Sequence, residues 1–290
     1  MPAPFAICYL NGEFLPLQEA RISPLDRGFL FADSVYEVLP VFAGRPFRFA
    51  EHFKRLDRSL REIRVAPPLS HGEWLKLLNE LVARNRASHA YIYVQVTRGM
   101  EFGRNHAFPA NVKPTIFAMA APLPELTDDI RAHGLSAVTV EDFRWGRCDI
   151  KTTALLANIL MKQAAADADA QEAIIVRDGY ALEGSSSSVF VVRNGVAITP
   201  PNDHRVLPGT TRDATLEMAQ GHFVTQVRAI PQQELFDAEE IWIASATRDV
   251  LPITRLNGRA VGAGKPGPVW RRMAELFDAE RRRLANTPAL

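Results

Sequence analysis

The sequence predicts a protein of the mixed α/β (α+β) class with two domains. The chain has 290 residues, which is enough for two hydrophobic cores. Strand-like and helix-like patterns occur in both halves. The stretch 121–125, Ala-Pro-Leu-Pro-Glu, has two prolines and disfavours regular structure. We therefore expect a smaller N-terminal α/β domain at 1–120, a linker at 121–125 and a larger C-terminal α/β domain at 126–290.

The N-terminal half opens with a hairpin pattern. Asn11-Gly12 suits the positive φ values of a tight turn between apolar runs at 7–10 and 14–17. An apolar stripe at helical spacing then predicts a helix over 51–64. The other expected elements are a strand at 35–42, a turn at 44–46, a helix at 74–84 and strands at 90–97 and 114–120.

The C-terminal half is expected to begin with a strand at 135–141, followed by a turn region that ends at Lys151. An alanine- and leucine-rich stretch predicts a helix from about 154 to 166. Asp178-Gly179 and Asn194-Gly195 mark turns between short strands. The other expected elements are strands at 173–176, 181–183, 189–192, 196–199, 241–244 and 251–255, and helices at 209–220 and 269–284.

Composition excludes several classes of partner. The chain has 34 basic and 33 acidic residues, so we expect neither nucleic acid nor a membrane as a partner. Cys8 and Cys148 are the only cysteines, and the start of the chain lacks the pattern of a signal peptide. The histidines and cysteines do not have the spacing of a metal site. We expect a cytoplasmic protein without a bound metal.

Lys151 is a candidate nucleophile. It follows Arg147-Cys148-Asp149-Ile150 and precedes the helix expected at 154–166. Partial burial at such a junction lowers the pKa of a lysine and frees its amine for Schiff-base chemistry. Taken alone, an ordinary solvated lysine is the simpler interpretation.

Several strand ends and one helix start carry groups that suit an anionic ring-containing ligand. Glu183 ends a strand and precedes Gly184 and four serines, and a carboxylate there could favour the protonated form of a pyridine. Gly209-Thr210-Thr211 opens a helix whose N–H groups could bind a phosphate. Ser245-Ala246 follows a strand and offers similar donors. An exposed strand end, a helix N-cap and simple turns are the alternatives.

Two further groups could bind anions through basic side chains. Arg55 lies beside the apolar stripe of the 51–64 helix and could donate two hydrogen bonds to a phosphate. Arg104 and His106 lie in a loop after the 90–97 strand and could hold a carboxylate together, with Tyr36 aiming its hydroxyl at the same anion. A surface arginine, a basic loop and a half-buried strand tyrosine are the simpler alternatives.

Taken together and in order, these motifs resemble fold-type-IV pyridoxal-phosphate (PLP) enzymes. That class holds branched-chain aminotransferases, D-amino-acid aminotransferases and aminodeoxychorismate lyases. The resemblance covers the chain from about Tyr9 to the last helix. It rests on the segments 33–38 (Asp-Ser-Val-Tyr-Glu-Val), 52–56 (His-Phe-Lys-Arg-Leu), 147–151 (Arg-Cys-Asp-Ile-Lys), 183–187 (Glu-Gly-Ser-Ser-Ser) and 208–213 (Pro-Gly-Thr-Thr-Arg-Asp).

The resemblance implies PLP as the cofactor, bound at the interface of the two domains. It makes Lys151 the Schiff-base lysine and proton carrier, and Glu183 the partner of the pyridine nitrogen. Leu207 is expected to pack against the ring. The residues implied for the phosphate are Arg55, Thr210, Thr211, Ser245 and Ala246, where Ala246 replaces an expected hydroxyl and offers only its backbone N–H.

A further segment is similar to the D-amino-acid aminotransferases. It runs from Tyr91 to Gly99 and continues to Arg104-Asn105-His106, and Trp145 also fits. In that group the Arg-x-His pair and the strand tyrosine, here Tyr36, bind the substrate carboxylate, and the loop is contributed across a homodimer interface. The spacer 100–103 is one residue longer than expected, which leaves the preferred side chain open.

We therefore expect a homodimeric PLP-dependent aminotransferase acting on D-amino acids of the D-alanine or D-glutamate type, with an acceptor such as 2-oxoglutarate. A branched-chain L-amino-acid aminotransferase is the nearest alternative on this scaffold. An aminodeoxychorismate lyase, which would need no 2-oxo acid, and a PLP-binding protein without activity are the others.

Overall fold

The computed structural model describes residues 3–286, which form two compact units. Among these residues, unit 1 combines 3–124 with Ile150–Ala154, and unit 2 combines Glu125–Asp149 with 155–286. Residues 150–154 were expected in the C-terminal domain. In the structure this segment belongs to unit 1 because its backbone pairs with a strand of that unit.

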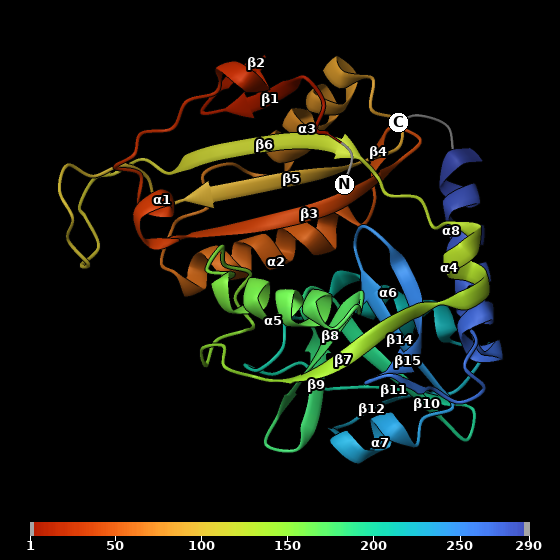
Figure 1. Cartoon of the computed structure of the whole chain (residues 1–290). Helices are drawn as coiled ribbons and strands as arrows, with labels where there is room; N and C mark the ends of the chain where they lie inside the picture. Colours follow the sequence, from red (N-terminus) through yellow and green to blue (C-terminus); the bar gives the residue numbers. More distant parts are fainter. Residues whose placement is uncertain (1–2, 287–290) are drawn as a thin grey trace. The chain divides into compact units, whose positions relative to one another are not determined.

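Unit 1 contains an antiparallel sheet in the order β2-β1-β6-β5-β3-β4 (Figure 1). The turn between β1 and β2 has the conformation expected from the sequence, because Asn11 adopts a positive φ of 50° there. The strands are β1 (Ile7–Leu10), β2 (Glu13–Pro16), β3 (Ser34–Phe42), β4 (Arg45–Pro46), β5 (Ala90–Thr97) and β6 (Thr115–Pro122).

Helices α2 (Phe49–Glu62) and α3 (His71–Asn85) bury their apolar stripes against this sheet. Phe53, Leu56 and Leu60 of α2 are fully buried in the core that also contains residues of β3 and β5. Ser70 and Glu73 form a capping box that fixes the start of α3. The unit also contains η1 (Leu17–Glu19) and α1 (Arg27–Phe31).

Unit 2 contains a sheet in the order β12-β11-β10-β14-β15-β7-β8-β9-β13, and β10 also pairs with β9. That last pairing joins Ser188 to Glu183 and closes the strands from β10 to β9 into a barrel. The strands are β7 (Leu135–Glu141), β8 (Glu172–Arg177), β9 (Tyr180–Gly184), β10 (Ser188–Arg193), β11 (Val196–Thr199), β12 (Thr225–Val227), β13 (Ile230–Pro231), β14 (Glu240–Ser245), β15 (Asp249–Leu256) and β16 (Arg259–Ala260).

Side chains of the barrel strands alternate between two buried faces. Ile241 and Ile243 point into one apolar cluster that draws on all the barrel strands, whereas Trp242 and Ala244 point into another that includes α8. Because both faces are buried, the sequences of these strands are almost continuously apolar. The helices of the unit are α4 (Asp128–His133), α5 (Leu156–Asp167), α6 (Thr210–Ala219), α7 (Gln232–Phe236) and α8 (Pro268–Asn286).

The expected mixed α/β class is confirmed, and the expected strands at 90–97 and 135–141 coincide with β5 and β7. The short helices α1, α4 and α7 were not predicted from the sequence. Each has five or six residues, which is too short for a helical period to show. Among the described residues, no helix combines the length and the apolar character that crossing a membrane requires.

The close approach of α1 to β5 gives a test of the unit 1 fold. A Cβ at Gly28 would lie 2.5 Å from Cγ2 of Thr97, so Gly28→Ala should destabilise the protein by about 1–3 kcal/mol. Gly72→Ala is the matched control because no atom lies within 4 Å of a Cβ placed there in α3. This control should keep or slightly raise stability, by up to ~1 kcal/mol. Equal melting temperatures for the two variants would contradict the packing.

Candidate active site

Lys151 lies on a segment that runs beside β3. Its carbonyl accepts a hydrogen bond from the Tyr36 N–H at 2.9 Å, and Val35 forms a β-bridge with Thr152. On the other side, the Lys151 N–H donates to Oγ of Ser59 on α2 at 3.3 Å. The backbone of the candidate lysine is therefore held between a strand and a helix.

The Lys151 amine lies over an aromatic face. Its Nζ is 4.2 Å from the centre of the Tyr36 ring, which stacks on Tyr93 at 5.5 Å between centroids. Within the described residues, Nζ makes no ion pair with a carboxylate. The ring fixes the position of the amine without neutralising it, so the amine stays available to a ligand.

Tyr93 belongs to a polar chain that leads back to the lysine segment. Burial and the nearby Tyr36 phenol raise the pKa of the Tyr93 hydroxyl, which donates to Oε1 of Gln95 at 2.8 Å. Gln95 in turn donates to Oγ of Ser34, and Ser34 shares a short hydrogen bond with Thr153. These neutral groups stabilise the backbone position of Lys151 without adding charge near its amine.

Arg55 is buried rather than exposed on the surface of α2, and it forms a bidentate ion pair with Glu37. Its Nε and Nη2 donate to the two carboxylate oxygens at 2.7 and 2.9 Å. His52 Nδ1 lies 2.7 Å from the same carboxylate. Burial alone would raise the pKa of Glu37, but the Arg55 charge holds it well below its usual range.

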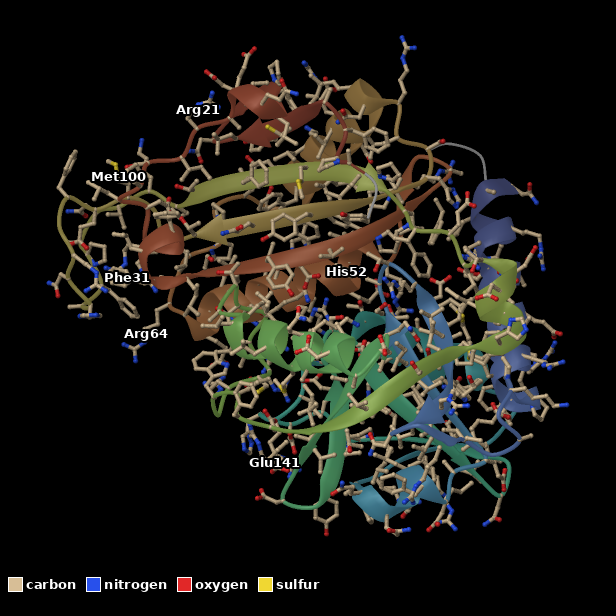
Figure 2. All side chains as sticks on the ribbon, in the orientation of Figure 1. Arg21, Phe31, His52, Arg64, Met100 and Glu141 are labelled. Atoms are coloured by element: carbon tan, nitrogen blue, oxygen red, sulfur yellow. The ribbon has the colours of Figure 1, made fainter. Side chains whose placement is uncertain are left out.

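Arg104 and His106 lie in the exposed loop between β5 and β6, which extends beyond the ends of these strands (Figure 1). Both side chains pack on Phe31 of α1: the Arg104 guanidinium carbon is 5.1 Å and the His106 ring 5.3 Å from its centre. Phe31 and Met100 lie at the same end of the unit 1 sheet (Figure 2). The ring contacts of Tyr36 in the described part of the chain are with Tyr93 and Lys151.

Glu183 is a buried carboxylate at the seam of the unit 2 barrel. Arg144 forms an ion pair with it, and the Leu207 N–H donates to its Oε2 at 3.1 Å. Burial raises the pKa of Glu183, and Arg144 opposes this shift only in part. A carboxylate with raised proton affinity is a strong acceptor for a protonated ring nitrogen.

Arg144 is itself held by a second carboxylate. Its Nε and Nη2 each lie 3.0 Å from an oxygen of Asp142, which also pairs with Arg177 at 2.9 Å. Burial would raise the pKa of Asp142, but hydrogen bonds and charge from Arg144 lower it. Asp142 therefore fixes the arginine, and the arginine fixes the orientation of Glu183.

The serine-rich turn after Glu183 uses its hydroxyls internally. Ser185 and Ser187 both donate to the buried Glu172 of β8, the latter at 3.1 Å. Asn158 of α5 donates to the Ser185 carbonyl at 2.8 Å. These hydrogen bonds brace the turn that carries Glu183.

The first turn of α6 begins after a glycine. Gly209 occupies the N-cap and provides no side-chain hydrogen bond to this turn, which starts with Thr210 and Thr211. A Cβ at position 209 would lie 2.5 Å from Oγ of Ser188, so glycine avoids a steric clash at this position. Ser245 ends β14, and Ala246 follows it; both are partly buried.

Comparison with known proteins identifies the family. The model of the family described as amino-transferase class IV matches residues 34–256. The chain is 37% identical to D-alanine aminotransferases of Bacillus licheniformis, over 89% of this chain and 91% of the relative, and of Staphylococcus haemolyticus, over 93% and 96%. The chain belongs to the class IV aminotransferases and is a PLP-dependent aminotransferase of fold type IV.

A solved structure supports the same fold. The T.th. branched-chain amino acid aminotransferase with pyridoxamine 5'-phosphate is 26% identical, with a TM-score of 0.88 over 97% of this chain and 96% of that one. The fold-type-IV class, the aminotransferase activity and the PLP cofactor expected from sequence are thus confirmed.

The buried pair of Glu37 and Arg55 predicts a specific pH dependence. The folded-state pKa of Glu37 lies below its unfolded value, so its stabilisation is present above about pH 4.3 and lost as the pH falls. Glu37→Gln should lower stability at neutral pH by ~3–5 kcal/mol, because buried Arg55 loses its partner. As the pH falls below about 5, the variant should lose less stability than the wild type, because it lacks the carboxylate that becomes protonated.

The matched control is Glu80→Gln, which removes an exposed ion pair with Arg84 on α3. It should change stability by less than about 1 kcal/mol and leave the acid slope unchanged. Thermal unfolding between pH 3 and pH 7 measures both variants, with the pH range set by ordinary carboxylate pKa values of roughly 4. An acid slope in Glu37→Gln as steep as that of the wild type would contradict the assignment.

Proposed function

We propose that the protein transfers the amino group of D-amino acids, of the D-alanine or D-glutamate type, to a 2-oxo acid such as 2-oxoglutarate. The likeness to D-alanine aminotransferases along about nine tenths of the chain carries this proposal. A cytoplasmic location remains a prediction from composition.

Three features of the structure suit PLP. Lys151 presents an amine that lies on a ring face without a carboxylate partner in the described residues. Glu183 is buried and has a raised pKa. The α6 N-terminus lacks a side-chain cap. When bound, the cofactor supplies a ring that withdraws electrons from the substrate α-carbon.

Lys151 is proposed as the catalytic residue. Its amine would hold the cofactor covalently at rest and, once displaced by the substrate amine, would carry the α-proton. The Tyr36 ring below Nζ limits where that amine can move. Glu183 would accept a hydrogen bond from the ring nitrogen and keep it protonated, with Arg144 holding the carboxylate in place.

The remaining cofactor residues are proposals in the same sense. Arg55 is held by Glu37 and is proposed to direct its positive charge toward the phosphate. Leu207 is tied to Glu183 through its N–H and would pack against the ring. The proposed phosphate donors beside Arg55 are Thr210, Thr211, Ser245 and the backbone N–H of Ala246.

Tyr36, Arg104 and His106 are proposed to bind the substrate carboxylate, with the loop supplied by a second copy in a homodimer. The loop is exposed, and Arg104 has no carboxylate partner in its own chain among the described residues. Phe102, at 86% exposure, and Phe108, at 53%, flank it. Exposed aromatic side chains beside an arginine are typical of a surface that a partner covers.

A branched-chain L-amino-acid aminotransferase is the second candidate. The structural likeness to such an enzyme favours it, at 26% identity. The two candidates differ in which enantiomer is accepted.

Turnover with 2-oxoglutarate as acceptor separates them. We expect D-alanine to react and L-leucine to react far more slowly. Arg104→Ala should raise the KM for D-alanine by about 10- to 100-fold, the loss expected for a charged hydrogen bond of ~1.5–3 kcal/mol. Lys54→Ala, an exposed substitution on α2, is the control and should change neither kcat nor KM. Preference for L-leucine, or an unchanged KM in Arg104→Ala, would overturn the proposed function.

A further inference from the structure

Arg27, the first residue of α1, is a buried arginine that the proposed chemistry does not use. Its side chain is 4% exposed, yet it contacts the loop that carries Arg104 and His106. A buried charge needs several partners, so the identity of those partners shows what the residue holds in place.

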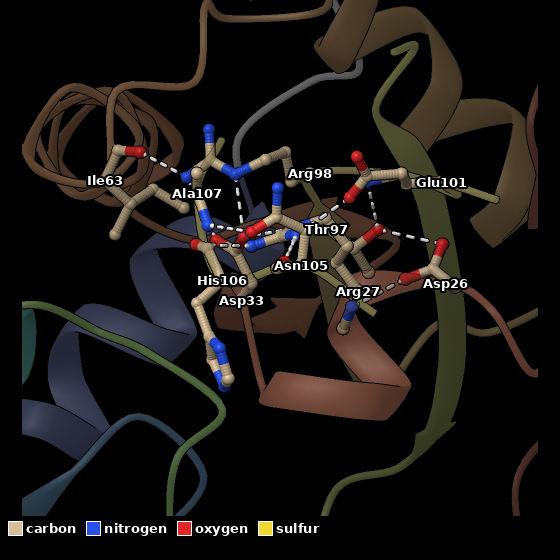
Figure 3. A network of polar contacts seen from close by, with 12 residues as sticks. Asp26, Arg27, Asp33, Ile63, Thr97, Arg98, Glu101, Asn105, His106 and Ala107 are labelled. Atoms are coloured by element: carbon tan, nitrogen blue, oxygen red, sulfur yellow. Dashed lines mark hydrogen bonds and ion pairs between the residues drawn. The ribbon is translucent and has the colours of Figure 1, made fainter. Parts of the chain in front are cut away.

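The guanidinium of Arg27 joins α1 to the loop. Nη1 donates to the Asn105 carbonyl at 2.6 Å, and Nη2 donates to the His106 carbonyl at 3.3 Å. Nε pairs with Asp33 at 2.9 Å, and Nη1 also pairs with Glu101 at 3.1 Å (Figure 3). The planar fork thus fixes two successive peptide groups of the Arg-x-His segment.

Asp33 connects this anchor to a second one. It accepts from Arg27 and, through both oxygens, from Arg98 at 2.7 and 3.0 Å (Figure 3). Arg98 also donates to the Ile63 carbonyl at 2.6 Å, and its guanidinium lies 3.8 Å from the ring centre of Phe108. The loop is therefore fixed on one side by Arg27 and on the other by Arg98.

Asp26 holds α1 itself against the strands from which the loop emerges. It caps the helix by accepting from the Gly28 N–H at 2.7 Å. It also accepts from the hydroxyls of Thr97 and Thr115, which are opposite each other at the ends of β5 and β6. The helix, the strand ends and the loop thus form one hydrogen-bonded assembly.

The side chains of the loop rest on α1 as well. Phe31 contacts three cationic or ionisable groups: Arg27 at 4.8 Å, Arg104 at 5.1 Å and the His106 ring at 5.3 Å between centres. Because the backbone is held by Arg27 and the side chains by Phe31, both the position and the direction of the Arg-x-His pair depend on α1.

We propose that Arg27 and Phe31 are positioning residues for substrate carboxylate recognition. They act through Arg104 and His106 and do not touch the substrate. This inference rests on the proposed function, because the proposed function is what gives the loop its role in binding the substrate carboxylate.

The test uses the holoenzyme of the Arg27→Lys variant. This variant keeps the positive charge but loses the planar guanidinium that donates to both carbonyl groups. We expect the KM for D-alanine to rise by about 10- to 100-fold while kcat at saturation changes much less. Binding of ethylamine, which is alanine without its carboxyl group, should not change. Phe31→Leu, at a partly exposed site, should raise the KM by about two- to fivefold.

A double-mutant cycle separates positioning from general structure. In an Arg104→Ala background, Arg27→Lys should raise the KM by less than about twofold, because the residue through which it acts is gone. Arg21→Ala is the matched control, because it removes an exposed arginine of the preceding segment (Figure 2). Within residues 3–286, this arginine bonds the nearby carbonyls of Gln18 and Ala20 and no carboxylate. This control should leave the KM unchanged.

Trypsin cleavage after Arg104 reports on the loop independently of activity. Cleavage should be faster in Arg27→Lys than in the wild type and in Arg21→Ala. The inference is overturned by unchanged cleavage, by additive effects in the cycle, or by an equal loss of ethylamine binding. If faster cleavage accompanies an unchanged KM in Arg104→Ala, the proposed function fails while the anchoring of the loop stands.

Discussion

The backbone hydrogen bond from the Tyr36 N–H to the Lys151 carbonyl is the contact on which the site in unit 1 depends. It attaches residues 150–154 to β3, although the chain on both sides of this segment belongs to unit 2. Tyr36 fixes the lysine twice, through its backbone and through the ring beneath Nζ. The next residue along β3, Glu37, points to the opposite face and anchors Arg55.

Charge is neutralised in both units by carboxylates that position arginines. In unit 1, Glu37 holds Arg55, and Asp33 holds two further arginines beside the loop that carries Arg104 and His106. In unit 2, Asp142 holds Arg144 against Glu183. Buried ion pairs of this kind add little net stability, but removal of one partner is costly, so they fix geometry rather than strengthen the fold.

Much of this structure follows from the sequence. Long periodic elements such as α2, β5 and β7 were predictable because each buries one regular face. Lys151 and Glu183 were proposed from motifs that are short continuous segments of the sequence. The contacts that position the candidate residues were not predictable, because they join segments far apart in the chain. Asp33 and Arg98 are 65 positions apart, and Arg27 and His106 are 79 apart, so no local pattern connects them. The return of residues 150–154 to β3 is a tertiary feature with no signal in composition.

The proposed chemistry requires that one amine, held on the ring of Tyr36, carry the cofactor. Borohydride reduction of the holoenzyme followed by peptide mapping identifies that amine. We expect the reduced cofactor on the peptide that contains Lys151 and on no other lysine. Recovery of the adduct on Lys54, on Lys162 or on no peptide would contradict it.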